Sequence, residues 1–475
     1  MPEVAVYKEI DVAKLLDFFR LKAKDKAEGT AEYYQKAVNN LQAYLDTLDE
    51  TAMFPSLDVI AGWIMNLYLC KLSGKSILLY FNSISALYSH AVKEGVAEKT
   101  DIFGRIKPII TKSLKTESVD REDLVRLKKL LSSAQYLSGE SRIAADLLLL
   151  SLLMGGKPIV EVAMLKKSDI IDDDPEVAAI VARNVDTRRK YIFNLRQHVL
   201  TPRQLERLVN GVTEDLLSRH GIRLFGSVND TIASYWAYTA LLTGISGRVI
   251  VGYLGYAPKG LPLLSLYDSE PCDGIMPDIK SVGAAFVKNP MRWYAMHLRP
   301  YVTYDELVER IGTVKNIIAP KLFYPLERIA KRIGKKLVFE DQPIISNIVF
   351  FNCRVTDIVP LFSNISDLAW CYTVNGKSGS QYAVISDSSF YRFQEAIGQF
   401  TTGYEPVAGF STVISAGTEV RVSGGLFVGM EASLEKVETL DGKSILQLMH
   451  RSDNNIKWSV GIDSRLVKPL YNRAQ

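Results

Sequence analysis

The chain has 475 residues and a formal net charge of +4, and 47% of its residues are hydrophobic and 23% charged. This composition is typical of folded globular proteins and excludes a disordered chain, while the length predicts roughly three domains. The longest apolar run, residues 144–156, is shorter than the roughly 20 residues that a transmembrane helix needs, so we expect no membrane partner.

The first residues lack the basic and apolar regions of a targeting segment, and the four cysteines lie far apart without a CxxC pair. Both features predict a cytoplasmic protein without a disulfide framework or a zinc site. The sequence also contains no Walker loop, no metal-binding cluster and no Ser-His-Asp arrangement, so we expect no cofactor and no metal.

Apolar residues at helical spacing predict an all-α first domain over residues 1–104. Two of its helices lie within residues 8–50, and Thr30 is expected to be the N-cap of the second. Two more helices are predicted at 57–69 and 76–94.

A basic stretch, residues 105–116, is expected to link this domain to the next, and it contains no acidic residue. Its four cations would contact a DNA backbone, because backbone contacts require only basic side chains and helix termini. A solvated linker is the alternative, and both interpretations stay open. The four residues are Arg105, Lys107, Lys112 and Lys115.

The second domain, residues 117–270, is predicted to be mainly helical, with a short β excursion at 177–182 and 190–195. Its helices are expected at residues 120–134, 140–154, 158–165, 201–220, 230–243 and 246–254.

The last part of the chain predicts an α/β domain over residues 290–405 and an all-β domain over 415–475. In the α/β domain, strands are expected at residues 293–298, 347–353 and 369–374, and helices at 303–312, 357–364 and 387–399. In the all-β domain, Gly425 and Gly429 would supply the positive φ angles of a turn, and Phe427 would pack on the fold.

Four segments of the first two domains carry a family resemblance: residues 29–34, 88–95, 161–170 and 188–190. In order and spacing they resemble the tyrosine recombinases of the phage integrase family. The resemblance implies a helical core-binding domain, an integrase-like catalytic-fold domain and double-stranded DNA as a partner. It also adds three DNA-binding residues: Arg188, Arg189 and Lys190.

Strand cleavage in that family requires two arginines around the scissile phosphate and a tyrosine nucleophile. By alignment to the family segments, the positions of this chemistry fall on residues that cannot perform it, with Lys190 as the exception. The replacing residues are Gly155, Asp230, Ala233, Tyr256 and Ser265. We therefore expect that the chain is not an enzyme.

The alternative is an active site-specific recombinase that uses displaced residues. These would be Lys190, His220, Arg223 and Tyr267. Residues 220–223 spell HxxR, the pattern of the second arginine box. Gly221, however, is expected to end the preceding helix rather than to open the next, and a tyrosine beside Leu266 is expected to be packed.

The segments 293–296, 342–351 and 424–429 resemble NusG, and more closely its UpxY-type antitermination paralogues. The resemblance implies a NusG N-terminal-like domain followed by a KOW-type, SH3-like β-barrel. It also implies a non-enzymatic transcription elongation or antitermination factor that binds the coiled-coil clamp of RNA polymerase. The polymerase-binding residues would be Trp293, Ile345 and Ile348, unless Trp293 and Ile348 fill the domain core.

A basic segment within residues 325–341 is expected to form a protruding hairpin or loop that contacts nucleic acid, with a solvated loop as the alternative. Its cations are Arg328, Lys331, Arg332, Lys335 and Lys336. The KOW-like barrel would bind nascent RNA or a ribosomal protein, with little support from its own residues. A third interpretation of the whole chain is an interaction scaffold that binds neither DNA nor polymerase.

Overall fold

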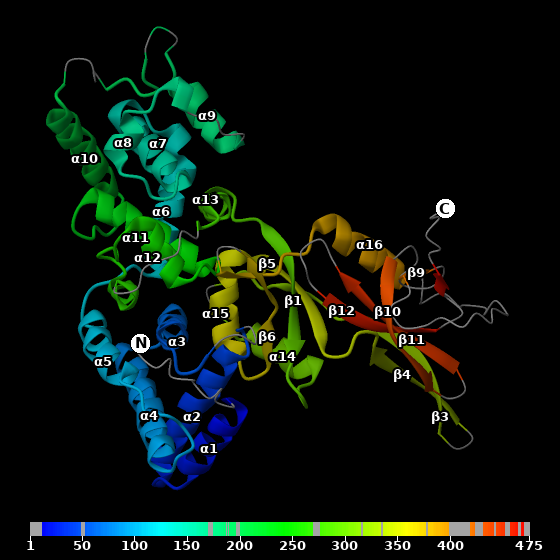
Figure 1. Ribbon diagram of the computed structural model, residues 1–475. Helices are drawn as coiled ribbons and strands as arrows, with labels where there is room; N and C mark the ends of the chain where they lie inside the picture. Colours follow the sequence, from blue (N-terminus) through cyan, green and yellow to red (C-terminus); the bar gives the residue numbers. More distant parts are fainter. Residues whose placement is uncertain are drawn as a thin grey trace, which may run out of the picture. The chain divides into compact units, whose positions relative to one another are not determined.

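The structure is a computed structural model (Figure 1). It describes residues 12–48, 53–169, 174–186, 188, 190–195, 200–268, 276–314, 317–333, 336–376, 379–398, 419–422, 431–440, 443–451, 457–463 and 467–469. They form two compact units. The first comprises Met1–Pro290, Arg354–Asp367 and Asn375–Gln381, and the second Met291–Cys353, Leu368–Val374 and Tyr382–Gln475.

The N-terminal part of the first unit is a helical bundle with a closely packed apolar core. Trp63 and Phe19 are fully buried in it, and the Trp63 indole donates a hydrogen bond to Asn40 Oδ1 at 2.9 Å. The expected helix at residues 57–69 is confirmed with the same bounds. The helices are α1 (Val12–Lys24), α2 (Glu28–Leu45), α3 (Leu57–Leu69), α4 (Gly74–Lys93) and α5 (Ile102–Ser113).

Two predictions for this bundle were wrong. Thr30 is not an N-cap, because α2 already begins at Glu28. Residues 105–113 are not a linker but belong to α5. Phe103, Ile106 and Ile110 recur at helical spacing on one side of α5 and are buried, so this segment folds as part of the core despite its charge.

The second part of the first unit is helical, as predicted. Capping boxes begin α6, α10 and α11, where a side chain at the N-cap and one three residues later each accept a backbone N–H. The helices are α6 (Arg121–Ser133), α7 (Gly139–Leu153), α8 (Ile159–Ala163), α9 (Pro175–Asn184), α10 (Pro202–Arg219), α11 (Val228–Leu242), α12 (Gly247–Leu254) and α13 (Ile279–Val287), with the 3₁₀ helices η1 (Ala134–Tyr136), η2 (Lys167–Asp169) and η3 (Pro262–Tyr267).

The predicted β excursion was wrong for both of its segments. Residues 175–184 form helix α9, which starts with Asp174 as N-cap and Pro175 in its first turn. Tertiary contacts hold this helix, because the fully buried Asp146 accepts hydrogen bonds from Arg183 and Asn184. In the segment 190–195 the structure has a single bridge, between Tyr191 and Lys166.

Helix α15 (Val355–Ile365) belongs to the first unit, although the strands that precede and follow it in sequence belong to the second. It packs against α11 and α3. Asp357 forms an ion pair with Arg121, and both side chains are largely buried, with 4% and 15% exposed. Asn289 donates a hydrogen bond to the Thr356 hydroxyl at 2.8 Å. The helix was expected, but its place among the helices of the first unit was not.

The second unit contains a four-stranded sheet with the order β2-β5-β1-β6. Burial alternates along its strands, so Tyr294 and Met296 lie on a fully buried face while Trp293 lies on a half-buried one. The strands are β1 (Met291–Leu298), β2 (Lys321–Phe323), β5 (Ile348–Arg354) and β6 (Ala369–Cys371), and the helices of this unit are α14 (Tyr304–Gly312) and α16 (Asp387–Gly398).

The expected hairpin at residues 325–341 is confirmed as the antiparallel pair β3 (Leu326–Ile333) and β4 (Lys336–Pro343). A second two-stranded pair consists of β7 (Thr373–Gly376) and β8 (Gly379–Tyr382).

The C-terminal part forms a five-stranded antiparallel sheet in the order β12-β11-β10-β9-β13. Its strands are β9 (Glu419–Val422), β10 (Glu431–Leu440), β11 (Lys443–Arg451), β12 (Lys457–Asp463) and β13 (Val467–Pro469). The predicted turn residues Gly425, Phe427 and Gly429 lie outside the described residues.

Candidate nucleic-acid interface and the recombinase-family positions

The position expected for the first catalytic arginine, Gly155, is closed by core packing. Gly155 has a φ of +85°, a conformation that side chains with a Cβ rarely adopt. A Cβ atom there would lie 2.2 Å from the Tyr253 hydroxyl and 3.2 Å from Ile279. The Tyr253 ring packs on Trp236, with 5.1 Å between ring centroids. No arginine fits at this position without displacing Tyr253.

The two positions expected on α11 have structural roles. The Ala233 side chain, on α11, is buried in the hydrophobic core, with 1% exposed. Asp230 accepts a hydrogen bond from the Ser227 backbone, which completes the capping box of α11. It also forms an ion pair with Lys259, 3.0 Å away. The Asp230 carboxylate is thus engaged in the helix cap and an ion pair at the position where the family places a histidine.

The positions near the expected nucleophile are no better suited to cleavage. Tyr256 is 42% exposed on the surface, and the Ser265 hydroxyl donates a hydrogen bond to the Pro262 carbonyl. Tyr267 is 3% exposed, and burial raises the pKa of its phenol well above the ordinary value. Its ring packs against Gly247, where a Cβ would approach it to 2.5 Å. The Tyr267 hydroxyl is thus both inaccessible and hard to ionise.

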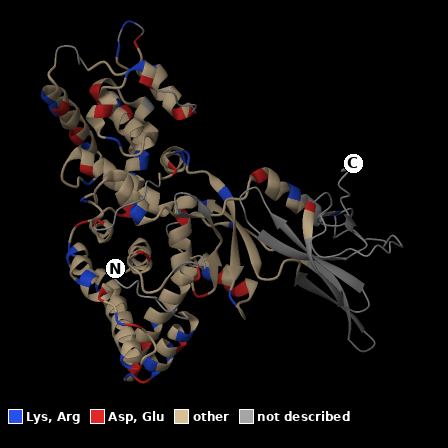
Figure 2. Cartoon of the chain, viewed as in Figure 1, with Lys and Arg blue, Asp and Glu red and all other residues tan. Residues whose placement is uncertain are grey.

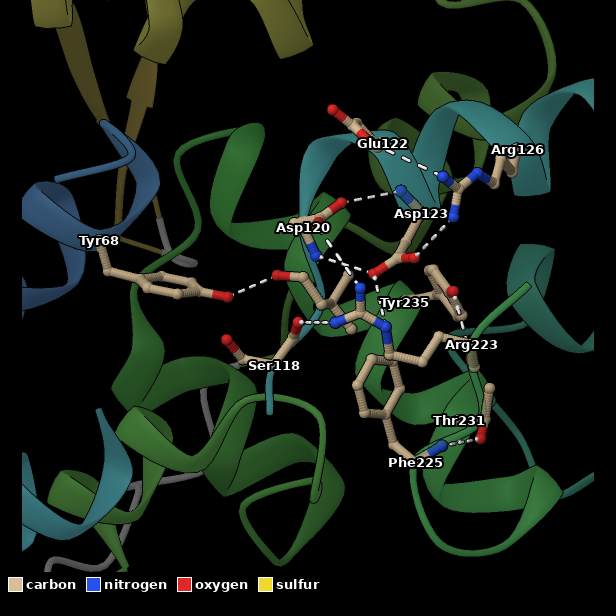
Figure 3. A network of polar contacts seen from close by, with 11 residues as sticks. Tyr68, Ser118, Asp120, Glu122, Asp123, Arg126, Arg223, Phe225, Thr231 and Tyr235 are labelled. Carbon is tan, nitrogen blue, oxygen red and sulfur yellow. Dashed lines mark hydrogen bonds and ion pairs between the residues drawn. The ribbon is translucent and has the colours of Figure 1, made fainter. Parts of the chain in front are cut away.

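The displaced candidates of the HxxR segment do not form a phosphate site either. As predicted, α10 ends here, since Gly221 has a φ of +62°. His220 is exposed at the C-cap. Figure 3 shows the guanidinium of Arg223 between Asp120 and Asp123, at 3.8 Å from each carboxylate.

The network around Arg223 holds the segment that joins α5 to α6. The guanidinium donates to the Ser118 carbonyl at 3.3 Å (Figure 3). The Tyr68 hydroxyl of α3 donates to the Val119 carbonyl at 2.5 Å. Burial raises the pKa of Asp123, whose side chain is fully enclosed, and raises the pKa of Tyr68 to about 12. Two carboxylates compensate the charge of Arg223, so it has a structural role.

The basic residues of α5 have a different environment. Its apolar side is buried, and the four predicted cations are all exposed: Arg105, Lys107 and Lys112 lie on the helix and Lys115 lies just after it. Figure 2 shows the Lys and Arg residues of the chain in blue. None of the four forms an ion pair with an acidic residue in the part of the chain that the structure describes. Arg105, Pro108 and Lys112 recur every three or four residues and share one face of the helix. Gly104, beside them, leaves the backbone accessible, with nothing within 4 Å of its Cβ position.

The other predicted DNA-binding residues lie between α9 and α10. Arg188 and Lys190 are exposed, and the Lys190 ammonium lies 5.9 Å from the centroid of the Tyr191 ring. Arg189 lies outside the described residues. In the β3–β4 hairpin, the backbones of Arg328, Lys331, Arg332 and Lys336 pair across the two strands, and Lys335 lies outside the described residues.

Of the predicted polymerase-binding residues, Trp293 and Ile348 lie on the half-buried face of the sheet. The Trp293 ring stacks on Phe390 of α16, with 3.7 Å between centroids and 22° between planes. Phe323 and Phe350 also pack on Phe390, so Trp293 belongs to an aromatic cluster that sequence periodicity did not indicate.

The half-buried face continues beyond this cluster. His297 stacks on Trp370 across the β1–β6 pair, with 4.3 Å between centroids, and the Arg299 guanidinium lies 5.4 Å from the Trp370 ring. Ile345 is half-buried just before β5 and adjoins the exposed Ser346 and Asn347.

No group of His, Cys, Asp and Glu side chains among the described residues could hold a metal ion. Within the same residues, no helix is both long and apolar enough to cross a membrane.

Comparison with known proteins supports the recombinase-like part of the chain. Residues 14–105 match the family described as the phage integrase SAM-like domain. No curated protein matches the chain. A solved structure described as "Domain interaction in Thermotoga maritima NusG" is similar over 38% of this chain and 98% of its own, with 15% identity and a TM-score of 0.25. A similarity of this size carries no argument about this chain.

Proposed function

We propose that the chain is a non-enzymatic transcription elongation or antitermination factor. Its helical unit binds double-stranded DNA, and its NusG-like part binds RNA polymerase. The observation that carries the proposal is the contrast within the first unit: packing closes the position of the first catalytic arginine, while the cations of α5 stay exposed and unpaired among the described residues. Such a unit can hold a DNA backbone electrostatically.

The polymerase partner is supported by the residue-level resemblance to NusG and by the half-buried aromatic face of the sheet. Aromatic and aliphatic side chains on such a face are typical anchors for a helical partner. Because Trp293 stacks on Phe390, its replacement would also loosen α16, so it is a poor test of docking. Ile345 is the better test, since it is half-buried in the bend just before strand β5.

The experiment is co-elution of the tagged full-length chain with core RNA polymerase. Ile345→Asp is expected to abolish co-elution, because a charge at an apolar docking surface is costly to desolvate. Ile318→Asp is the matched control, because Ile318 is 46% exposed in the same unit and is not a predicted contact. Co-elution that survives Ile345→Asp would refute the assigned face, and no co-elution of the unaltered chain would refute the polymerase partner.

The recombinase alternative makes an opposite prediction. On a nicked suicide substrate, an active enzyme would form a phosphotyrosyl adduct that Tyr267→Phe abolishes. We expect no adduct with either protein, since the Tyr267 hydroxyl is buried.

A further inference from the structure

Three helix ends meet at one end of the N-terminal bundle. Helix α3 ends at Leu69, α4 begins at Gly74, and α5 ends at Ser113. The first residue of α4 packs directly on the residue that follows α5, because a Cβ on Gly74 would lie 3.3 Å from the Leu114 Cβ. A small surface pocket lies between these three helix ends. Its lining includes Tyr68, Leu72, Gly74, Leu114 and Thr116.

Lysines outnumber acidic residues at this end of the bundle, where the exposed Glu117 follows the last of them. Lys71 lies in the turn between α3 and α4 and Lys75 in the first turn of α4, while Lys112 lies in the last turn of α5 and Lys115 just after it. Residues 59–93 and 102–116 contain no aspartate or glutamate, whereas acidic residues occur at 94, 98 and 101, where α4 ends and α5 begins. The four lysines, all exposed and without an ion-pair partner among the described residues, are Lys71, Lys75, Lys112 and Lys115.

Lys71 occupies a position that favours glycine. Its φ is +60°, and the turn closes around it, with the Lys71 backbone N–H donating to the Tyr68 carbonyl at 2.9 Å and the Leu72 N–H donating to the Leu67 carbonyl at 3.2 Å. This is the geometry in which helices commonly end on glycine, because a Cβ in the left-handed region is strained. A lysine there costs stability, and what it adds is an exposed cation beside Lys75.

We propose that this basic end, formed by Lys71, Lys75, Lys112 and Lys115, binds the sugar–phosphate backbone of double-stranded DNA. The inference rests on the proposed DNA-binding function and extends it, because Lys71 and Lys75 lie outside α5 and no sequence motif pointed to them. The partner follows from charge complementarity: a phosphate backbone offers closely spaced negative charges that neutralise several lysines at once.

The experiment measures the affinity of the full-length chain for a short DNA duplex of arbitrary sequence over a series of NaCl concentrations. Log affinity falls with log salt, and each lost phosphate contact makes this slope shallower by about 0.9. Lys71→Gly combined with Lys75→Ala is therefore expected to make the slope shallower by about 1.8. For each lost contact, the ratio of the DNA affinity of the unaltered chain to that of the variant falls about 3.5-fold between about 50 and about 200 mM salt.

The single variant Lys71→Gly distinguishes a loss of DNA binding from a loss of folding stability. It removes the cation and also relieves the left-handed strain, so we expect weaker DNA binding together with a higher melting temperature. A general loss of structure would move both quantities downward. Lys99→Ala is the control, because Lys99 is exposed at the acidic end of the bundle and should leave both the slope and the affinity unchanged.

The possible outcomes separate this inference from the proposed function. If the unaltered chain binds DNA with a steep salt dependence and the Lys71 and Lys75 variants bind equally well, the inference is wrong while DNA binding stands. If the unaltered chain shows no salt-dependent affinity, DNA binding itself is refuted. Tighter binding to an RNA duplex of the same length would overturn DNA as the partner.

Discussion

Gly155→Ala tests directly whether the first arginine position is closed. The substitution places a Cβ at a φ of +85°, which costs about 1–2 kcal/mol for a residue other than glycine. The same Cβ would lie 2.2 Å from the Tyr253 hydroxyl, and overpacking of this kind costs about 1–3 kcal/mol. We therefore expect Gly155→Ala to lower the free energy of unfolding by about 2–5 kcal/mol.

Two matched variants separate the two contributions. Gly95→Ala introduces a Cβ at a φ of +72° with nothing within 4 Å, so it should cost only the backbone strain of about 1–2 kcal/mol. In a Tyr253→Phe background the clashing hydroxyl is absent, and the cost of Gly155→Ala should fall toward the same value. The double-mutant cycle then gives a coupling energy of about 1–3 kcal/mol.

Chemical denaturation followed by tryptophan fluorescence is the assay, since Trp236 packs on Tyr253. The reasoning is refuted if Gly155→Ala destabilises no more than Gly95→Ala, or if Tyr253→Phe leaves its cost unchanged. Either result would mean that the position can open, and an arginine could then be accommodated there.

Further predictions concern the charge cluster at α15 and the Arg223 network. Asp357→Ala should cost about 3–5 kcal/mol, because it leaves Arg121 buried without its carboxylate, and replacing both residues by apolar ones should cost less. Burial lowers the pKa of Lys128 to about 8, so the folded protein loses this proton before the unfolded chain does, and stability should rise with pH from about 8 to about 10.5. Lys128→Met should remove this rise in pH titrations of the unfolding free energy, and an identical rise in the variant would exclude Lys128 as its source. Arg223→Ala should lower the free energy of unfolding, because the buried Asp123 carboxylate loses a compensating charge.

Local sequence patterns predicted most helices and strands of this chain. Helix α3 was expected at its observed bounds, because its apolar run is flanked by Ser56 as N-cap and a break after Leu69. The end of α10 near Gly221 was also expected, since a glycine after a basic last turn commonly ends a helix. These signals lie within a few residues of the element that they define.

The two failures have different causes. The charge of residues 105–113 suggests a linker, although Phe103, Ile106 and Ile110 form a helical stripe that the sequence already shows. In α9, β-branched residues suggested a strand, but buried contacts to Asp146 stabilise a helix. Local propensity is weak enough for such tertiary contacts to override it.

The sequence by itself determined most helices and strands of this protein and their order. Only the tertiary structure decided that Tyr253 fills the space at Gly155, that α15 packs among the helices of the first unit, and that Lys71 and Lys75 lie at the same end as the end of α5. Helical periodicity and caps depend on neighbours along the chain, whereas a closed site or a shared surface depends on residues that folding brings together from distant segments.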